Sequence, residues 1–157
     1  MLFHVRAALC TVLAVLLVFG NASRAQAQSS SPMSIQLSGA GLVIAGGIVP
    51  GAEVQARFTA QRLSVGGGYQ VFTKDGARSD IVFVEPRVRV ANTSNAAIYA
   101  AARAGFVTAS KTAVFGGGGG LLIAAGRNRA VDVGAQVYST DAKSVVTQVR
   151  VGISLGF

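Results

Sequence analysis

Large apolar residues occupy every second position through most of this chain, and this period limits the folds open to it. In the last segment one face carries Val149, Val151, Ile153, Leu155 and Phe157. Successive side chains of a β-strand point to opposite faces, whereas a helix repeats every 3.6 residues. A strand with one apolar face must turn that face away from water. The chain is therefore predicted to form a sheet with one surface against protein or lipid.

Eight segments have strand character, and none has a convincing helical pattern. The segments are residues 33–44, 52–60, 63–73, 81–90, 96–107, 112–125, 130–139 and 145–157. Short pieces rich in Gly, Asn, Asp, Ser or Pro separate them, among them GGIVPG, KDGARS and GRNR. Turn-forming residues at such regular spacing are typical of an all-β chain. The sequence predicts an eight-stranded antiparallel up-and-down β-barrel over residues 33–157.

The polar face of these strands carries most of the charged residues that lie outside the turns. By alternation, its charged members are Glu53, Arg57, Glu85, Arg87, Arg89, Arg103, Asp132 and Arg150. Many glycines share this face. The interior of an eight-stranded barrel is just wide enough to be filled by side chains. Glycine mixed with a few long polar groups suits that interior, and we expect these charges to form a compensated network in the lumen.

Charge content separates a membrane barrel from a soluble one. Only 13% of the residues are charged, against about 25–35% on an ordinary soluble surface. The apolar rows hold essentially no charge, and a charge on the lipid face would cost about 2–4 kcal/mol at the bilayer midplane. We expect a transmembrane barrel with apolar side chains toward lipid and the polar face inside.

The N-terminal residues have the layout of a secretory signal peptide. Arg6 gives a positive start, Ala7–Phe19 is an apolar run, and Ala25-Gln26-Ala27 supplies a small-x-small cleavage pattern. The apolar run is shorter than the roughly 20 residues of a transmembrane helix. We predict a signal peptide over residues 1–27, a short polar leader over 28–32, and the barrel over 33–157.

The last nine residues, VRVGISLGF, resemble the C-terminal signature of bacterial outer-membrane β-barrel proteins. That signature is a final aromatic preceded by apolar residues at every second position, and Val149, Val151, Ile153, Leu155 and Phe157 fill it. The segment FGGGGGLLIAAGRNRAVDVGAQVYST also looks like a hairpin of small family members. The resemblance implies an eight-stranded barrel of the OmpA-domain and OmpX type with both termini periplasmic. It also implies that these five residues are the signal recognised by the barrel-assembly machinery.

Motifs that suggest catalysis lack the groups that catalysis needs. GISLG around Ser154 matches a nucleophile pattern, but that chemistry needs a strand–turn–helix context and a His base. The only histidine, His4, and the only cysteine, Cys10, lie within the predicted signal peptide. The run Gly116–Gly120 lacks the Lys-Ser/Thr of a phosphate-binding loop. We expect no enzyme, no cofactor and no metal.

The expected function is a structural, envelope-maintaining role for a monomer in the cell outer membrane. Its expected partners are outer-membrane lipid and lipopolysaccharide, with no nucleic acid. Two alternatives stay open at this point. The first is a small pore whose arginine-rich lumen excludes cations. The second is a soluble periplasmic binding barrel of the lipocalin type, which predicts an apolar lumen.

Overall fold

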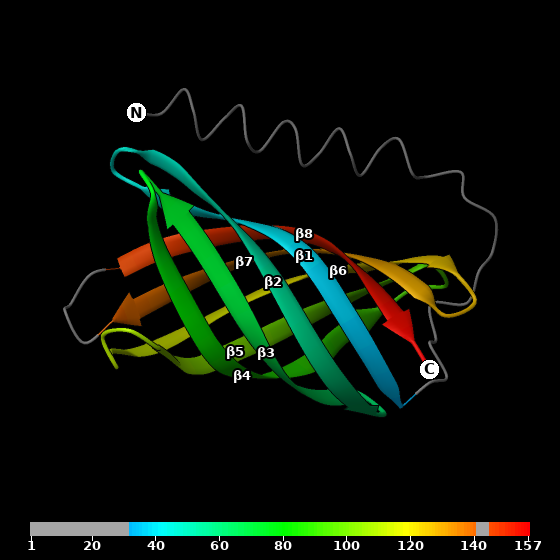
Figure 1. Ribbon diagram of the computed structural model, residues 1–157. Coiled ribbons are helices and arrows are strands. Elements are labelled where there is room, and N and C mark those ends of the chain that lie inside the picture. The colour runs from blue at the N-terminus through cyan, green and yellow to red at the C-terminus, as the bar shows by residue number, and fades with distance from the viewer. Residues whose placement is uncertain (1–31, 141–144) are drawn as a thin grey trace.

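The computed structural model describes residues 32–140 and 145–157, and these form a single closed barrel of eight strands (Figure 1). The strands are β1 (Met33–Ile44), β2 (Gly47–Ala60), β3 (Leu63–Lys74), β4 (Ala77–Asn92), β5 (Ala96–Val107), β6 (Ala113–Gly126), β7 (Arg129–Thr140) and β8 (Val145–Gly156). Among the described residues no helix is long and apolar enough to cross a membrane. The predicted signal peptide, and the leader up to residue 31, lie outside the described residues.

Each strand pairs antiparallel with the next, and β8 returns to pair with β1. The closing ladder runs from Ser34 opposite Gly156 to Val43 opposite Thr147. Figure 1 shows the blue β1 beside the red β8, with the C-terminus near the start of β1. The prediction of an eight-stranded antiparallel up-and-down barrel is confirmed. Closure leaves no free strand edge along the wall.

Two strands begin earlier than the sequence predicted. β2 starts at Gly47 rather than residue 52, and β4 starts at Ala77 rather than residue 81. The sequence predicts turns over the whole of GGIVPG and KDGARS, whereas two-residue turns at 45–46 and 75–76 close these hairpins. Asp75 and Gly76 have φ values of 51° and 79°, as a hairpin turn of the Asp-Gly type requires.

The hairpin between β1 and β2 extends beyond the ladder of its neighbour. Pairing with β3 starts at Gly51, so the residues from Gly47 to Pro50 pair with β1 alone. Pro50 has no backbone N–H to donate. It is accommodated here because the edge of β2 that faces away from β1 has no partner strand at this position. No residue from Gly41 to Gly51 has a polar side chain. This apolar hairpin lies at the end of the barrel opposite the C-terminus (Figure 1).

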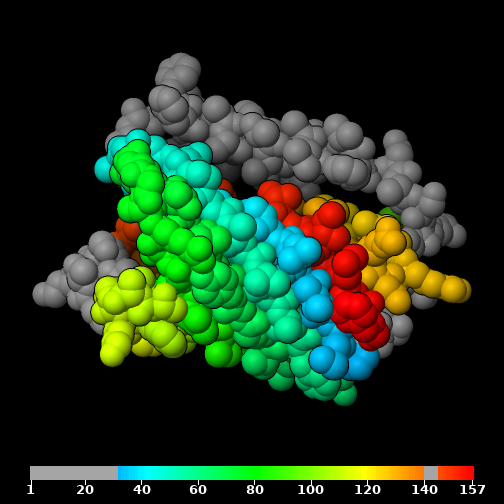
Figure 2. Space-filling view, in the orientation of Figure 1, coloured from blue at the N-terminus to red at the C-terminus, as the bar shows by residue number. Residues whose placement is uncertain are grey.

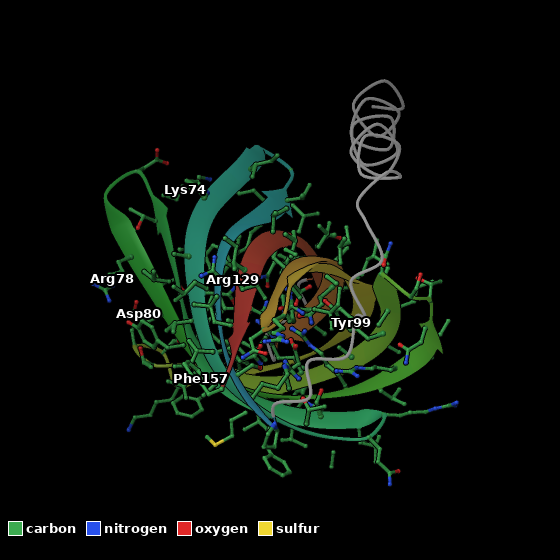
Figure 3. All side chains as sticks on the ribbon, turned by 90° about the vertical axis from the view of Figure 1, so that its right-hand side faces the viewer. Lys74, Arg78, Asp80, Tyr99, Arg129 and Phe157 are labelled. Atoms are coloured by element: carbon green, nitrogen blue, oxygen red, sulfur yellow. The ribbon has the colours of Figure 1, made fainter. Side chains whose placement is uncertain are left out.

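The wall turns its apolar side outward. Ile153 is 55% exposed and Phe157 is 66% exposed, while Arg103 is only 3% exposed. In the space-filling view the side chains of β1, β2 and β3 lie side by side over this outer surface (Figure 2). Figure 3 looks into the barrel from the end where β1 begins and β8 ends, which is called the terminal end below. In this view Tyr99 points inward, and Arg78 and Asp80 lie outside the wall. The expected orientation of the two faces is therefore the one observed.

Two layers fill the interior. At the end of the barrel that carries the β1–β2, β3–β4 and β5–β6 connections (the loop end), Val49, Phe72, Ile81 and Phe83 form an apolar cluster. Below this cluster, in the middle of the barrel, lie the buried charged residues described in the next section. The inner face is therefore not polar throughout, because its loop-side half contains aromatic and aliphatic side chains.

Glycines on the inner face of β6 make room for large neighbours. A Cβ at Gly116 would overlap the ring of Tyr138, and one at Gly120 would overlap the hydroxyl of Tyr99. A Cβ at Gly117, on the outer face, would meet only ordinary van der Waals contact, at 3.5 Å from the Ala101 carbonyl oxygen. The glycine run in β6 thus provides space inside a narrow barrel.

Candidate functional site

Glu85 on β4 is the centre of a buried ionic network and is 0% exposed. Its carboxylate accepts hydrogen bonds from Arg57, Arg87, Arg103, Arg150 and Gln136. The Nε of Arg87 lies 2.6 Å from Oε1 of Glu85, and the Nε of Arg103 lies 2.7 Å from Oε2. A carboxylate with two oxygens has about four acceptor positions, so Glu85 is fully engaged.

Two further carboxylates complete the network. Glu53 on β2 accepts from Arg103 at 2.7 Å and from Arg150 at 3.3 Å. Asp132 on β7 accepts from Arg87 at 2.7 Å and from the Tyr99 hydroxyl at 2.6 Å. Ion pairs thus join residues from opposite sides of the barrel. Because the partners lie on several strands, the network connects the wall across the lumen.

Aromatic rings lie over the faces of two guanidinium groups whose nitrogens bind the carboxylates. The Arg103 Cζ lies 3.6 Å from the centroid of the Phe83 ring, and the Arg87 Cζ lies 4.4 Å from that of Tyr99. Cations within about 6 Å of a ring face are attracted to it. The contact between Arg103 and Phe83 connects the ionic layer to the apolar cluster above it.

The structure brings together all but one of the charged residues that alternation placed inside. Glu53, Arg57, Glu85, Arg87, Arg103, Asp132 and Arg150 are buried and share ion pairs. Arg89 is half-buried and belongs to no ion pair among the described residues. It lies one inward position closer to the strand end than Arg87, at the mouth where β1 begins and β8 ends.

Glutamines and tyrosines also belong to the site, in addition to the charged residues that the sequence predicts there. The buried members are Gln36, Gln55, Gln70, Gln136, Gln148, Tyr99 and Tyr138. Gln55 accepts from Arg57 at 2.8 Å, and Gln36 accepts from Arg87 at 3.2 Å. The same alternation that placed the arginines inside also places these residues there. Their place on the inward-facing side of the strands is therefore the sequence signal that predicts them.

The arrangement offers little for catalysis. Each buried carboxylate is held by arginines, so none is free to act as a base. Ser154 lies near the terminal end of β8, in a regular strand rather than a sharp strand-to-helix turn. Within residues 32–140 and 145–157, no cluster of His, Cys, Asp or Glu is placed to hold a metal. The site is best described as a packed, charged core.

The residues of the expected assembly signal lie along the outer face of β8. Val149, Val151, Ile153, Leu155 and Phe157 all carry exposed side chains. The backbone N–H of Phe157 donates to the Met33 carbonyl oxygen at 2.9 Å. These residues therefore lie in the closing ladder with β1, on the surface that the barrel presents outward.

Comparison with known proteins identifies the fold. No family model and no curated protein sequence matches this chain. A de novo designed transmembrane β-barrel superposes with a TM-score of 0.62 at 15% identity, over 79% of this chain and 95% of that one. Neisserial surface protein A gives 0.58 at 13% identity, over 80% and 96%. The outer membrane protein Ail of Yersinia pestis, in a bilayer nanodisc, gives 0.57 at 16% identity, over 81% and 99%. The chain has the fold of small outer-membrane β-barrels.

Proposed function

We propose that this protein is an integral outer-membrane β-barrel with a filled polar lumen and a structural role in the cell envelope. The observation that carries the proposal is the inversion of its two faces. Charged residues at Glu85, Asp132 and Arg150 are buried, while large apolar residues cover the outside. A soluble protein rarely exposes a continuous apolar surface of this kind.

The outer surface has the features of a lipid-facing wall. Phe58 and Phe157 are exposed near the terminal end, and Phe106 and Phe115 are exposed near the loop end. Aromatic side chains at both edges of an apolar band are typical of transmembrane barrels, where they occupy the two interfaces. The fold shared with Ail, an outer membrane protein, supports the same location.

A filled lumen favours a structural role over conduction. At the level of Glu85, four arginines and Gln136 contact one carboxylate. Phe72 and Phe83 pack together above this level. An ion crossing here would have to break several charge-assisted hydrogen bonds. The pore alternative would need a path past this layer, and the lipocalin alternative would need an apolar lumen where these charged residues lie.

The proposal includes export, insertion and partners. The predicted signal peptide directs export, and the outer row of β8 serves the barrel-assembly machinery. Lipid and lipopolysaccharide surround the finished monomer. No catalytic step is assigned, because the buried carboxylates are all bound by arginine.

One matched pair of variants tests the location. Val151 lies in the middle of the wall, opposite Gly39 of β1 and Val133 of β7, and Ala109 lies in the exposed connection between β5 and β6. In the full chain, Val151→Arg should lower the membrane-inserted fraction strongly, because it costs about 2–4 kcal/mol on a lipid face. Ala109→Arg should have little effect.

Two measurements read the result. Cell fractionation gives the membrane-inserted amount, and gel migration of unboiled against boiled sample gives the folded amount. Wild type should fractionate with the outer membrane and migrate faster unboiled. Recovery in the soluble periplasm, with Val151→Arg and Ala109→Arg behaving alike, would overturn the proposal. Stable conductance of the folded protein in planar bilayers would instead support the pore.

A further inference from the structure

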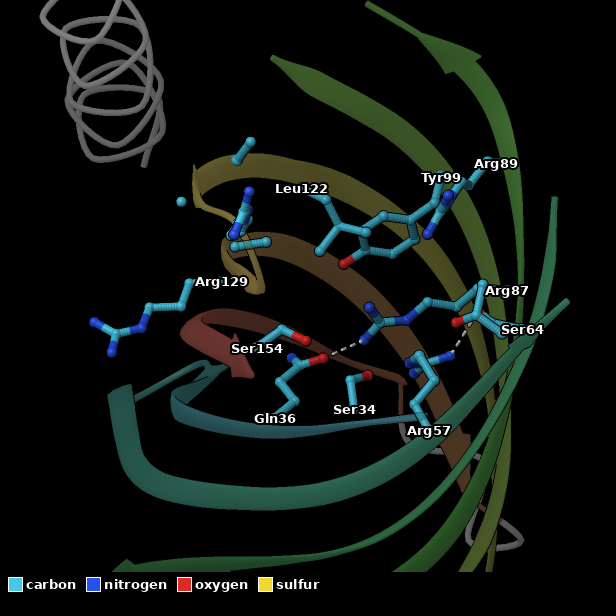
Figure 4. Close-up of a pocket in the computed structure, with 15 residues that line it drawn as sticks. Ser34, Gln36, Arg57, Ser64, Arg87, Arg89, Tyr99, Leu122, Arg129 and Ser154 are labelled. Atoms are coloured by element: carbon cyan, nitrogen blue, oxygen red, sulfur yellow. Dashed lines mark hydrogen bonds between the residues drawn. The ribbon is translucent and has the colours of Figure 1, made fainter. Parts of the chain in front are cut away.

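A cavity of about 60 Å³ opens at the terminal end of the barrel (Figure 4). Residues from all eight strands line it, and Ser34, Ser64 and Ser154 contribute hydroxyl groups. Five arginines line it, namely Arg57, Arg87, Arg89, Arg127 and Arg129. No carboxylate is among the lining residues. A volume of this size exceeds the space needed for a single water molecule.

The buried charges of the barrel are not balanced. Among the described residues, four arginines are buried, Arg57, Arg87, Arg103 and Arg150, against three carboxylates, Glu53, Glu85 and Asp132. The half-buried Arg89 adds another positive charge beside the cavity. A buried charge without compensation is costly in a medium of low dielectric constant. The excess is positive, and two of the four buried arginines, Arg57 and Arg87, line this cavity.

Polar groups on the cavity wall still have donors to offer. The buried Nε of Arg57 has no hydrogen-bond partner among the described residues. The other nitrogens of Arg57 donate to Ser64, Gln55 and Glu85, so its position is fixed. Arg89, on the same strand as Arg87, also lines the cavity, and its guanidinium forms no ion pair with any carboxylate of the described residues. Figure 4 shows Arg57, Ser64, Arg87 and Arg89 on the same side of the cavity.

We propose that this cavity binds an oxyanion of the phosphate class, contacted by the guanidinium of Arg89, with the hydroxyl of Ser64 as a further donor and the charges of Arg57 and Arg87 in its wall. Guanidinium groups match the geometry of phosphate oxygens and bind them through charge-assisted hydrogen bonds. The anion compensates the excess positive charge of the lumen. Its source is either free phosphate or the phosphate of an anionic lipid beside the mouth.

The test is a titration of the folded full chain in zwitterionic detergent with inorganic phosphate at constant ionic strength. Isothermal calorimetry gives the affinity, and the temperature at which the fast-migrating gel band is lost gives the stabilisation. Wild type should bind saturably and unfold at a higher temperature with phosphate. Arg89→Gln should weaken binding by about tenfold or more, the effect of one lost charge-assisted contact.

Arg62→Gln is the matched control. Arg62 lies in the exposed turn between β2 and β3 at the same end of the barrel, and it does not line the cavity. Its replacement should leave phosphate binding unchanged. The double variant Arg127→Gln and Arg129→Gln, in and beside the turn before β7, gives a second test should Arg89→Gln fail to fold. It should weaken binding while Arg62→Gln does not.

A second arm distinguishes the two sources of phosphate. Wild type and Arg89→Gln are compared in nanodiscs of phosphatidylcholine with and without phosphatidylglycerol. Saturable binding of inorganic phosphate supports the free anion, and stabilisation by phosphatidylglycerol that Arg89→Gln removes supports the headgroup. Either result supports the site. Absence of both effects, or equal losses in Arg89→Gln and Arg62→Gln, would overturn it.

Discussion

Arg150 on β8 crosses the lumen to Glu85 on β4, on the opposite side of the eight-stranded ring. Its Nη1 lies 3.0 Å from Oε2 and its Nη2 lies 3.2 Å from Oε1, so the pair is bidentate. Such pairs combine strength with fixed geometry. This contact holds opposite walls together in a way that strand pairing cannot.

Replacing the central carboxylate should be strongly destabilising. Glu85→Gln keeps the shape but removes the charge that four arginines share, and breaking a buried ionic group costs about 3–5 kcal/mol. Denaturant unfolding in lipid vesicles measures the loss. Asp80→Asn is the control, because Asp80 pairs with Arg78 outside the wall. Equal effects of the two variants would show that Glu85 has no central role.

Removing one arginine should cost less than removing Glu85. After Arg150→Met, Glu85 still accepts from Arg57, Arg87 and Arg103, and the excess of positive charge falls. We expect a loss of about 1–3 kcal/mol, the usual size of a lost hydrogen bond to a charged group. The same unfolding measurement ranks the variants. A larger loss for Arg150→Met than for Glu85→Gln would contradict the charge balance described above.

Inner and outer glycines of β6 should respond differently to a methyl group. Gly120→Ala places a Cβ against the Tyr99 hydroxyl and the Val133 carbonyl oxygen, and overpacking of this kind costs about 1–3 kcal/mol. Gly117→Ala meets no such obstacle and should be neutral or slightly stabilising. Loss of the fast-migrating gel band on heating compares the two. The interpretation fails if both variants unfold at the same temperature.

The apolar hairpin of β1 and β2 should contact lipid. The chain contains no tryptophan, so single substitutions give clean fluorescent reporters. Ile48→Trp, at a position that is 67% exposed, should be quenched by brominated lipid, whereas Ala109→Trp in a polar connection should not. Val151→Trp reports insertion of the wall itself. Quenching of Val151→Trp alone would show that the hairpin lies outside the bilayer.

Alternation was enough to predict the strands and the facing of most charges. Period two fixes which side of a sheet a residue occupies, so Glu85, Arg103 and Asp132 could be placed inside from the sequence alone. The starts of β2 and β4 differ from the prediction because Pro50 and the Asp75-Gly76 pair are residue types that occur in longer loops as well as in tight hairpins. Asp-Gly is itself the signal of a two-residue hairpin turn, so the start of β4 is predictable from the sequence.

The partners within the lumen could not be predicted in the same way. Glu85 and Arg150 are 65 positions apart in sequence, and their contact depends on how strands of the closed ring are staggered. Neither composition nor facing carries that information. Arg89 illustrates the limit, because the same alternation that placed it beside Arg87 could not show that it ends at the mouth rather than in the network.

The hydrogen bond between Phe157 and Met33 has a consequence for the chain as a whole. With first and last strands joined through a full ladder, the ring has no structurally privileged starting strand. A few residues could link those two positions, and the backbone could be reopened in the turn at residues 93–95. Such a circular permutant would keep every ladder and every cross-lumen contact while changing the order in which the strands leave the ribosome.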